Sequence, residues 1–156
     1  MEFTIQSTKA FRVMGISMLL STDQQENFKQ CAAFWGKAAS EGTIGRLASL
    51  MNGQPAGLLG VSFPNEDGTD KYCICVATTA PLQEGLEEFE VPETTWAIFK
   101  GCGKDMPMQE LQVKIVNEWL PTSGYEYLKT PDMDVYVDPD PVTGRYEVWI
   151  PVGKKE

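Results

Sequence analysis

Hydrophobic side chains change their spacing several times along the first half of the chain, and each change predicts a different element. Residues 10–20 hold a continuous apolar run, which indicates a strand. Asp23 and Glu26 then form a D-x-x-E start signal for a helix. One apolar stripe follows at helical spacing, at Phe28, Cys31, Ala32, Trp35 and Ala39.

Gly42 interrupts this helical pattern, and a second short helix is predicted beyond it. Its apolar positions are Ile44, Leu47, Ala48 and Met51. Two apolar segments, 56–63 and 71–78, then flank the turn-rich stretch PNEDGTD, which predicts a β-hairpin.

The second half repeats this order. Residues 94–101 are rich in β-formers and predict a strand. Residues 106–119 predict an amphipathic helix, with Asp105 as its cap. Residues 132–137 and 145–152 alternate as strands around the turn-rich DPDPVTG. The helical stripe is Met108, Leu111, Ile115 and Trp119.

The repeated order predicts an α+β fold in which two β-α-β-β units form an antiparallel sheet. We expect helices on one side of that sheet and a ligand cleft between the units. At 156 residues the chain is expected to be one domain over residues 1–156. Its halves are residues 1–79 and 94–152, and the Pro-, Glu- and Gly-rich residues 80–93 connect them.

The amino-acid composition disfavours or excludes several classes of function. The net charge of -9 disfavours nucleic acid as a partner. No apolar segment approaches the length of a membrane span, so we expect a cytoplasmic protein without a signal peptide. The four cysteines suit free thiols. The absence of histidine excludes His-based nucleophile chemistry and His-ligated metals, so we expect no metal and no cofactor.

The last predicted hairpin holds the main candidate site. If its two strands present matching faces, Asp134 and Tyr136 share a face with Glu147 and Trp149. That face is either an outer polar surface or a concave aromatic surface with carboxylates at its floor. The second arrangement binds organic cations and raises carboxylate pKa values.

Other candidates are weighed in the same way. Trp96 suits either the cleft or the core, whereas Trp35 and Trp119 lie on helical apolar stripes and are expected in the core. Asp132, nearer the end of its strand, is expected to be solvated.

The C-terminal half resembles the GyrI-like small-molecule-binding domain, which is also the effector-binding domain of AraC-type and MerR-type multidrug regulators. The resemblance covers residues 94–152 through WAIFKG, EWLPTSGYE, PDMDVY and YEVWIPV in order. It implies a duplicated fold around a cleft for hydrophobic, often cationic molecules. The family's buried Glu matches Asp134, and its second acidic position matches Glu147.

The resemblance implies a small-molecule-binding protein, similar to stand-alone members, with ligand contacts from Asp134, Glu147, Trp149, Tyr136 and Trp96. We expect binding rather than catalysis. One alternative is a cofactor-free hydrolase of strained-ring toxic compounds, with Asp134 as its catalytic carboxylate. Another is an interaction protein whose partner is DNA gyrase or a regulator protein.

Overall fold

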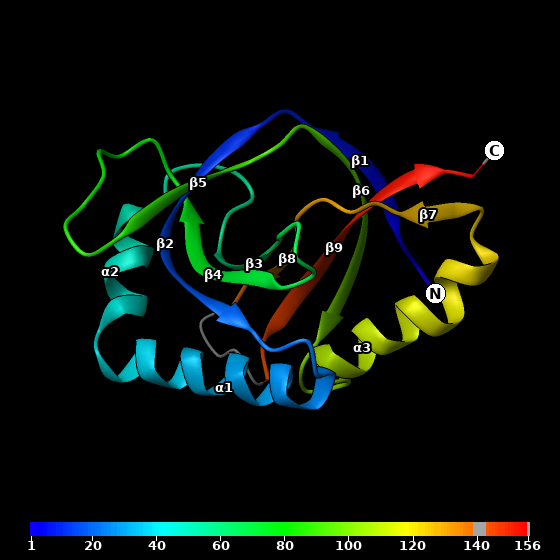
Figure 1. Cartoon of the computed structure of the whole chain (residues 1–156), viewed down its shortest axis with the longest axis horizontal. Coiled ribbons are helices and arrows are strands. Elements are labelled where there is room, and N and C mark those ends of the chain that lie inside the picture. The colour runs from blue at the N-terminus through cyan, green and yellow to red at the C-terminus, as the bar shows by residue number, and fades with distance from the viewer. Residues whose placement is uncertain (139–142, 156) are drawn as a thin grey trace.

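The computed structural model describes residues 1–138 and 143–155, and the chain adopts an α+β fold (Figure 1). Within those residues it has nine strands in an antiparallel sheet and three α-helices. The first half contains β1 (Thr4–Thr8), β2 (Phe11–Leu20), α1 (Gln24–Ser40), α2 (Thr43–Leu50), β3 (Leu58–Pro64) and β4 (Asp70–Ala77). The second contains β5 (Glu87–Val91), β6 (Thr94–Cys102), α3 (Met108–Lys114), β7 (Tyr125–Tyr127), β8 (Asp132–Tyr136) and β9 (Arg145–Lys154).

The strand order is symmetric about the centre of the sheet. It runs β1-β6-β9-β8-β3-β4-β2-β5, with β7 paired to β9 beside this path. The order reads the same from either edge when each strand of the first unit is exchanged for its counterpart in the second: β1 for β5, β2 for β6, β3 for β8 and β4 for β9. The two units therefore meet where β3 pairs with β8, with Gly60 opposite Asp134.

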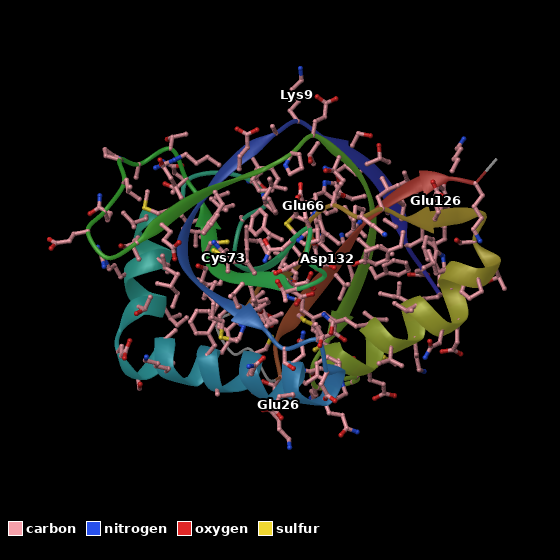
Figure 2. The ribbon with its side chains drawn as sticks, in the orientation of Figure 1. Lys9, Glu26, Glu66, Cys73, Glu126 and Asp132 are labelled. Carbon is pink, nitrogen blue, oxygen red and sulfur yellow. The ribbon has the colours of Figure 1, made fainter. Side chains whose placement is uncertain are left out.

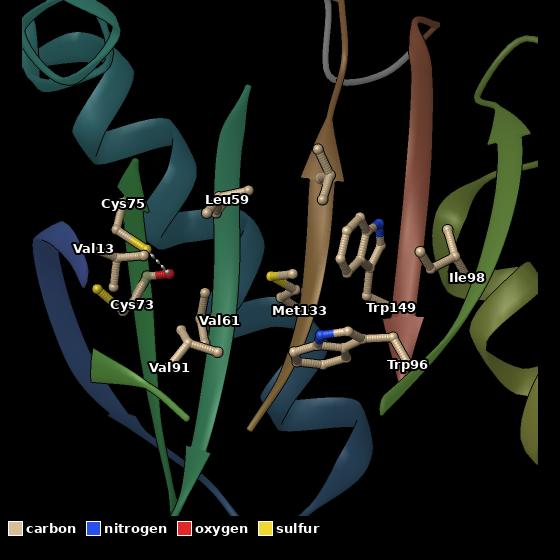
Figure 3. Close-up of a cluster of buried hydrophobic side chains, with 11 residues drawn as sticks. Val13, Leu59, Val61, Cys73, Cys75, Val91, Trp96, Ile98, Met133 and Trp149 are labelled. Atoms are coloured by element: carbon tan, nitrogen blue, oxygen red, sulfur yellow. Dashed lines mark hydrogen bonds between the residues drawn. The ribbon is translucent and has the colours of Figure 1, made fainter. Parts of the chain in front are cut away.

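The sheet has both faces covered by side chains. Figure 1 shows it strongly curved, with α1 and α3 along one side. The other face packs against itself as an inner cluster, which Figure 3 shows around Met133, Trp149 and Trp96. Two further apolar clusters lie beneath the helices, one under α3 and one under α1 and α2. Because both faces are covered, alternation along a central strand does not separate core from solvent.

The predicted helices are present, with differences at the ends of the second-half helix. Asp23 caps α1, its carboxylate accepting from the Glu26 amide at 3.0 Å. The expected cap at Asp105 is not observed; Pro107 precedes α3 and makes no side-chain cap bond. After Lys114 the helix widens into a π-helical turn, Ile115–Trp119, and then a 3₁₀ turn, Leu120–Thr122.

The hairpin strands were predicted close to their observed bounds, but three short strands were not anticipated. β1 and β5 form the two edges of the sheet, and β5 lies inside the 80–93 connection, where it pairs with β2. β7 follows the helical turns and pairs with β9. The predicted DPDPVTG turn includes residues 139–142, which lie outside the described residues.

Candidate ligand-binding site

A cavity of about 520 Å³ lies between the helices and the central strands. Its walls come from α1, from α3 with the following π-helical turn, and from β4, β7, β8 and β9. This volume lies in the range of small-molecule sites. Because elements of both units contribute to its walls, the cavity forms where the two units meet.

Asp134 projects into this cavity from β8. Strand alternation buries Met133 and Val135 on the inner face and turns Asp134 and Tyr136 toward the helices. The Gln112 amide of α3 donates to Asp134 Oδ1 at 2.8 Å. That neutral hydrogen bond fixes the carboxylate without neutralising its charge.

Asp132 also lines the cavity, so the expectation that it is solvated is wrong. It lies two residues before Asp134 on the same face of β8. Its carboxylate accepts from the Tyr127 hydroxyl and from Ser62. Figure 2 labels Asp132 within the curve of the sheet, whereas Glu26 points outward from α1. The correction has a simple cause: β7 and β3 cover this end of β8.

Burial shifts the ionisation of both carboxyl groups. It raises the pKa of Asp134 to about 8, with the nearby Asp132 charge adding to the rise and the Gln112 hydrogen bond opposing it. Burial likewise raises the pKa of Asp132 to about 6, against the hydrogen bond from Tyr127. The pair therefore changes charge near neutral pH.

Aromatic side chains form the wall beside Asp134. The Trp35 and Tyr136 ring centroids are 4.6 Å apart. The Trp35 indole N–H donates to the Tyr72 hydroxyl at 2.9 Å, and Tyr72 is hydrogen-bonded to Tyr136. Burial and the Asp134 charge raise the pKa of the Cys31 thiol to about 11, which keeps it protonated. The wall thus combines flat rings with neutral polar groups.

Glu147 does not share a face with Asp134, and this part of the sequence prediction is wrong. The β8–β9 register places Met133 opposite Trp149 and Val135 opposite Glu147. Glu147 therefore belongs to the opposite face, where it accepts from the Trp149 indole N–H at 2.9 Å and borders a second cavity of about 560 Å³. The prediction paired the two polar-looking faces, but the strand carrying Glu147 is offset by one residue.

The prediction that Trp149 shares a face with Asp134 is also wrong, because the register places Trp149 opposite Met133, on the inner face. Trp149 borders both cavities, and its ring packs in the inner cluster 5.7 Å from that of Trp96. Trp96 is fully buried there and donates its indole N–H to Thr8 Oγ1 at 2.8 Å. Of the two positions that the sequence left open for Trp96, the structure shows the core.

Sequence reasoning missed several cavity residues. Trp35 packs against the core under α1 as expected, but its helical stripe, with Phe28 and Cys31, also faces the cavity. The apolar stripe could have indicated a cavity wall, because side chains that line a cavity and side chains that face a core repeat at the same helical spacing. Gln112 gave no such signal, since nothing about a glutamine between Leu111 and Val113 on α3 marks it as a cavity residue.

Among the described residues, no group of three metal-ligating side chains lies close enough to hold a metal ion. Within the same residues, no helix has the length and apolar character needed to cross a bilayer.

A family model, Cass2, integron-associated effector binding protein, matches residues 4–152. Three solved structures share the fold. SAV2435 bound to tetraphenylphosphonium is 22% identical with a TM-score of 0.86, over 98% of this chain and 94% of that one. The EcmrR C-terminal domain is 15% identical with a TM-score of 0.64, over 99% and 98%.

The third structure is the integron cassette protein VCH_CASS2, from the mobile metagenome of Vibrio cholerae. It is 16% identical with a TM-score of 0.63, over 97% of this chain and 95% of that one. No protein with a curated description matches the chain in sequence.

Proposed function

Because the chain belongs to the Cass2 family of integron-associated effector binding proteins, we propose that its central cavity captures an amphipathic organic cation with aromatic groups. The protein acts as an effector-binding or sequestering domain, of the kind that AraC-type and MerR-type regulators carry. We further propose that residues 1–156 form one domain built from duplicated β-α-β-β units around the cavity, and that it works in the cytoplasm.

One observation carries this proposal: Asp134 lies half-buried in an aromatic cavity whose described lining contains no Lys or Arg. A buried carboxylate without a cationic partner is unfavourable when ionised. A bound cation supplies the missing charge, and the rings of Trp35 and Tyr136 favour it through cation–π contact. A neutral ligand of the same shape has only the apolar contacts.

The relative SAV2435 supports this ligand class, because it shares the fold and was solved with a lipophilic aromatic cation. In this chain the proposed contacts come from Asp134 for charge and from Tyr136 and Trp35 for the aromatic wall. Trp149 contributes where it borders the cavity. Glu147 and Trp96 are assigned no direct contact.

The test is a titration with tetraphenylphosphonium followed by tryptophan fluorescence, since Trp35 lines the cavity. We expect Asp134→Asn to weaken binding about 10-fold or more at pH 8, because the charge is lost while the amide oxygen still accepts from Gln112. Glu66→Gln makes the same change in net charge on an exposed loop and is the matched control. Equal affinities for wild type and Asp134→Asn would overturn the proposal.

A second candidate is a hydrolase, and the ionisation of Asp134 favours it. A carboxyl group with a pKa of about 8 beside a tyrosine hydroxyl suits general acid–base chemistry. An enzyme would hydrolyse strained-ring alkylating compounds and lose turnover in Asp134→Asn. A panel of such compounds without turnover, at concentrations that saturate the cavity, separates binding from catalysis.

The sequence-based hypothesis of a protein partner, DNA gyrase or a regulator protein, does not use the cavity. It is tested independently by pull-down with the ligand-free protein. Recovery of either partner at equal yield from wild type and Asp134→Asn would support that role.

A further inference from the structure

Several carboxyl groups line the cavity, although one bound positive charge would need only one carboxylate as its partner. Asp134 and Asp132 lie on one face of β8. The rise of a strand places their Cα atoms about 7 Å apart. Asp70, at the start of β4, lines the same cavity and raises the pKa of Asp132 through its charge. Each of the three carboxyl groups lines the same cavity.

The two carboxyl groups of β8 have separate surroundings. Asp134 is held by Gln112 beside the Trp35 and Tyr136 rings. Asp132 is held by the hydroxyls of Tyr127 and Ser62, from β7 and β3. A group bound at one carboxylate therefore leaves the other carboxylate free to contact a different part of the ligand.

Neither carboxyl group has a cationic protein partner among the described residues. The ion pairs there join Arg12 to Glu88 and Arg145 to Asp138, and none of these four residues lines the cavity. A single cationic centre beside Asp134 thus leaves the charge at Asp132 unmatched.

We propose that the cavity prefers aromatic dications whose two cationic centres match the spacing of the β8 carboxyl groups, with one centre at Asp134 and the second at Asp132. This inference rests on the proposed function, because it specifies the ligand of the same site. Two charge-matched contacts within one ligand make the second contact intramolecular, which increases affinity without a second association step. The charge of Asp70 adds to the negative field at Asp132 and so favours a cationic group there.

The test compares benzamidine with benzene-1,4-diamidine, whose two cationic groups fit a two-residue strand spacing, and uses tetraphenylphosphonium as the monocation reference. In wild type at pH 7.5 we expect the diamidine to bind about 10-fold more tightly than the monoamidine. In Asp132→Asn that ratio should fall to about 1–3. The amide keeps an oxygen that accepts from Tyr127, and Glu66→Gln, which matches the change in net charge, should keep the wild-type ratio.

Proton release provides a second readout that packing alone would not move. Calorimetry at pH 5.5 in two buffers of different ionisation enthalpy counts the protons released. We expect the diamidine to release more protons than the monoamidine in wild type, and the two to release equal numbers in Asp132→Asn.

The outcomes separate the two proposals. If tetraphenylphosphonium and the monoamidine bind but the diamidine gains nothing, or its gain survives in Asp132→Asn, the dication inference is overturned and the cation site stands. If none of the three cations binds, the proposed function fails and the inference fails with it.

Discussion

Asp134 is a carboxyl group that the described residues surround with rings and one amide but no cation. Its ionised form is therefore unfavourable in the empty protein and favourable with a cation bound. The same residue that weakens the empty fold near neutral pH provides the proposed recognition.

This coupling predicts how stability depends on pH. The folded-state pKa values of Asp134 and Asp132, about 8 and about 6, exceed the usual value of 3.8. The folded state binds more protons than the unfolded state between about pH 4 and pH 8, so this contribution is complete below pH 4 and lost as pH rises through 8. We expect the free energy of unfolding of the empty protein to fall across that range.

Asp134→Asn should remove much of this dependence. We expect the variant to be more stable than wild type at pH 8.5, by on the order of 2 kcal/mol, because a neutral amide replaces a buried charge. Urea unfolding at pH 5 and pH 8.5 measures it, with Glu66→Gln as control. A variant less stable than wild type at pH 8.5 would contradict the assigned environment.

Single residues were predictable where a motif or spacing singled them out. Asp134 was found because PDMDVY matches a family strand, and Tyr136 because it shares the face of Asp134. Glu147 was misplaced because the β8–β9 register offsets its strand by one residue, and Asp132 was dismissed because the coverage of its end of β8 by β7 and β3 is not visible in the sequence. Both faces of these central strands are buried, so the polar side chains do not mark a solvent face.

At the scale of elements, the β2–β4 pairing depends on one close backbone approach. A Cβ at Gly15 would contact the Ile74 carbonyl oxygen and lie 2.7 Å from the Cys75 Cα. Gly15 stands opposite Cys75 in the register, so the strands cannot separate there without losing ladder bonds.

Gly15→Ala should therefore destabilise the protein by about 2 kcal/mol or more. Gly36→Ala is the matched substitution in α1, where no atom lies within 4 Å of the added Cβ. It should stabilise by about 0.5–1 kcal/mol, since alanine is the better helix former. Denaturant unfolding of both variants checks the opposite signs, and a neutral Gly15→Ala would show that the strands are less tightly paired.

Elements with their own periodicity were predictable, and the others depended on partners distant in sequence. The stripes of α1 and α3 and the hairpin β3–β4 were found from local pattern. β1 and β5 were missed because each is five residues long and pairs along one side only, with β6 and β2. The π-helical turn after Lys114 has no sequence signal that separates it from regular helix.

At the scale of the whole molecule, the repeated order of elements predicted the cavity's place between the two units. In the observed sheet the two units meet where β3 pairs with β8, and the cavity lies over that junction. Side-chain orientation there required the register, which pairs residues 70 to 78 positions apart. The sequence therefore predicted the architecture better than it predicted which side chains line the cavity.

The central claim is that the cavity selects ligands by positive charge as well as by shape. The most direct measurement compares tetraphenylphosphonium with tetraphenylborate, an anion of the same shape, by calorimetry at pH 8. We expect tetraphenylphosphonium to bind at least about 100-fold more tightly, because the anion would meet unpaired carboxylates. Equal affinities for the two ions would contradict the claim, since shape and apolar contact alone would then explain binding.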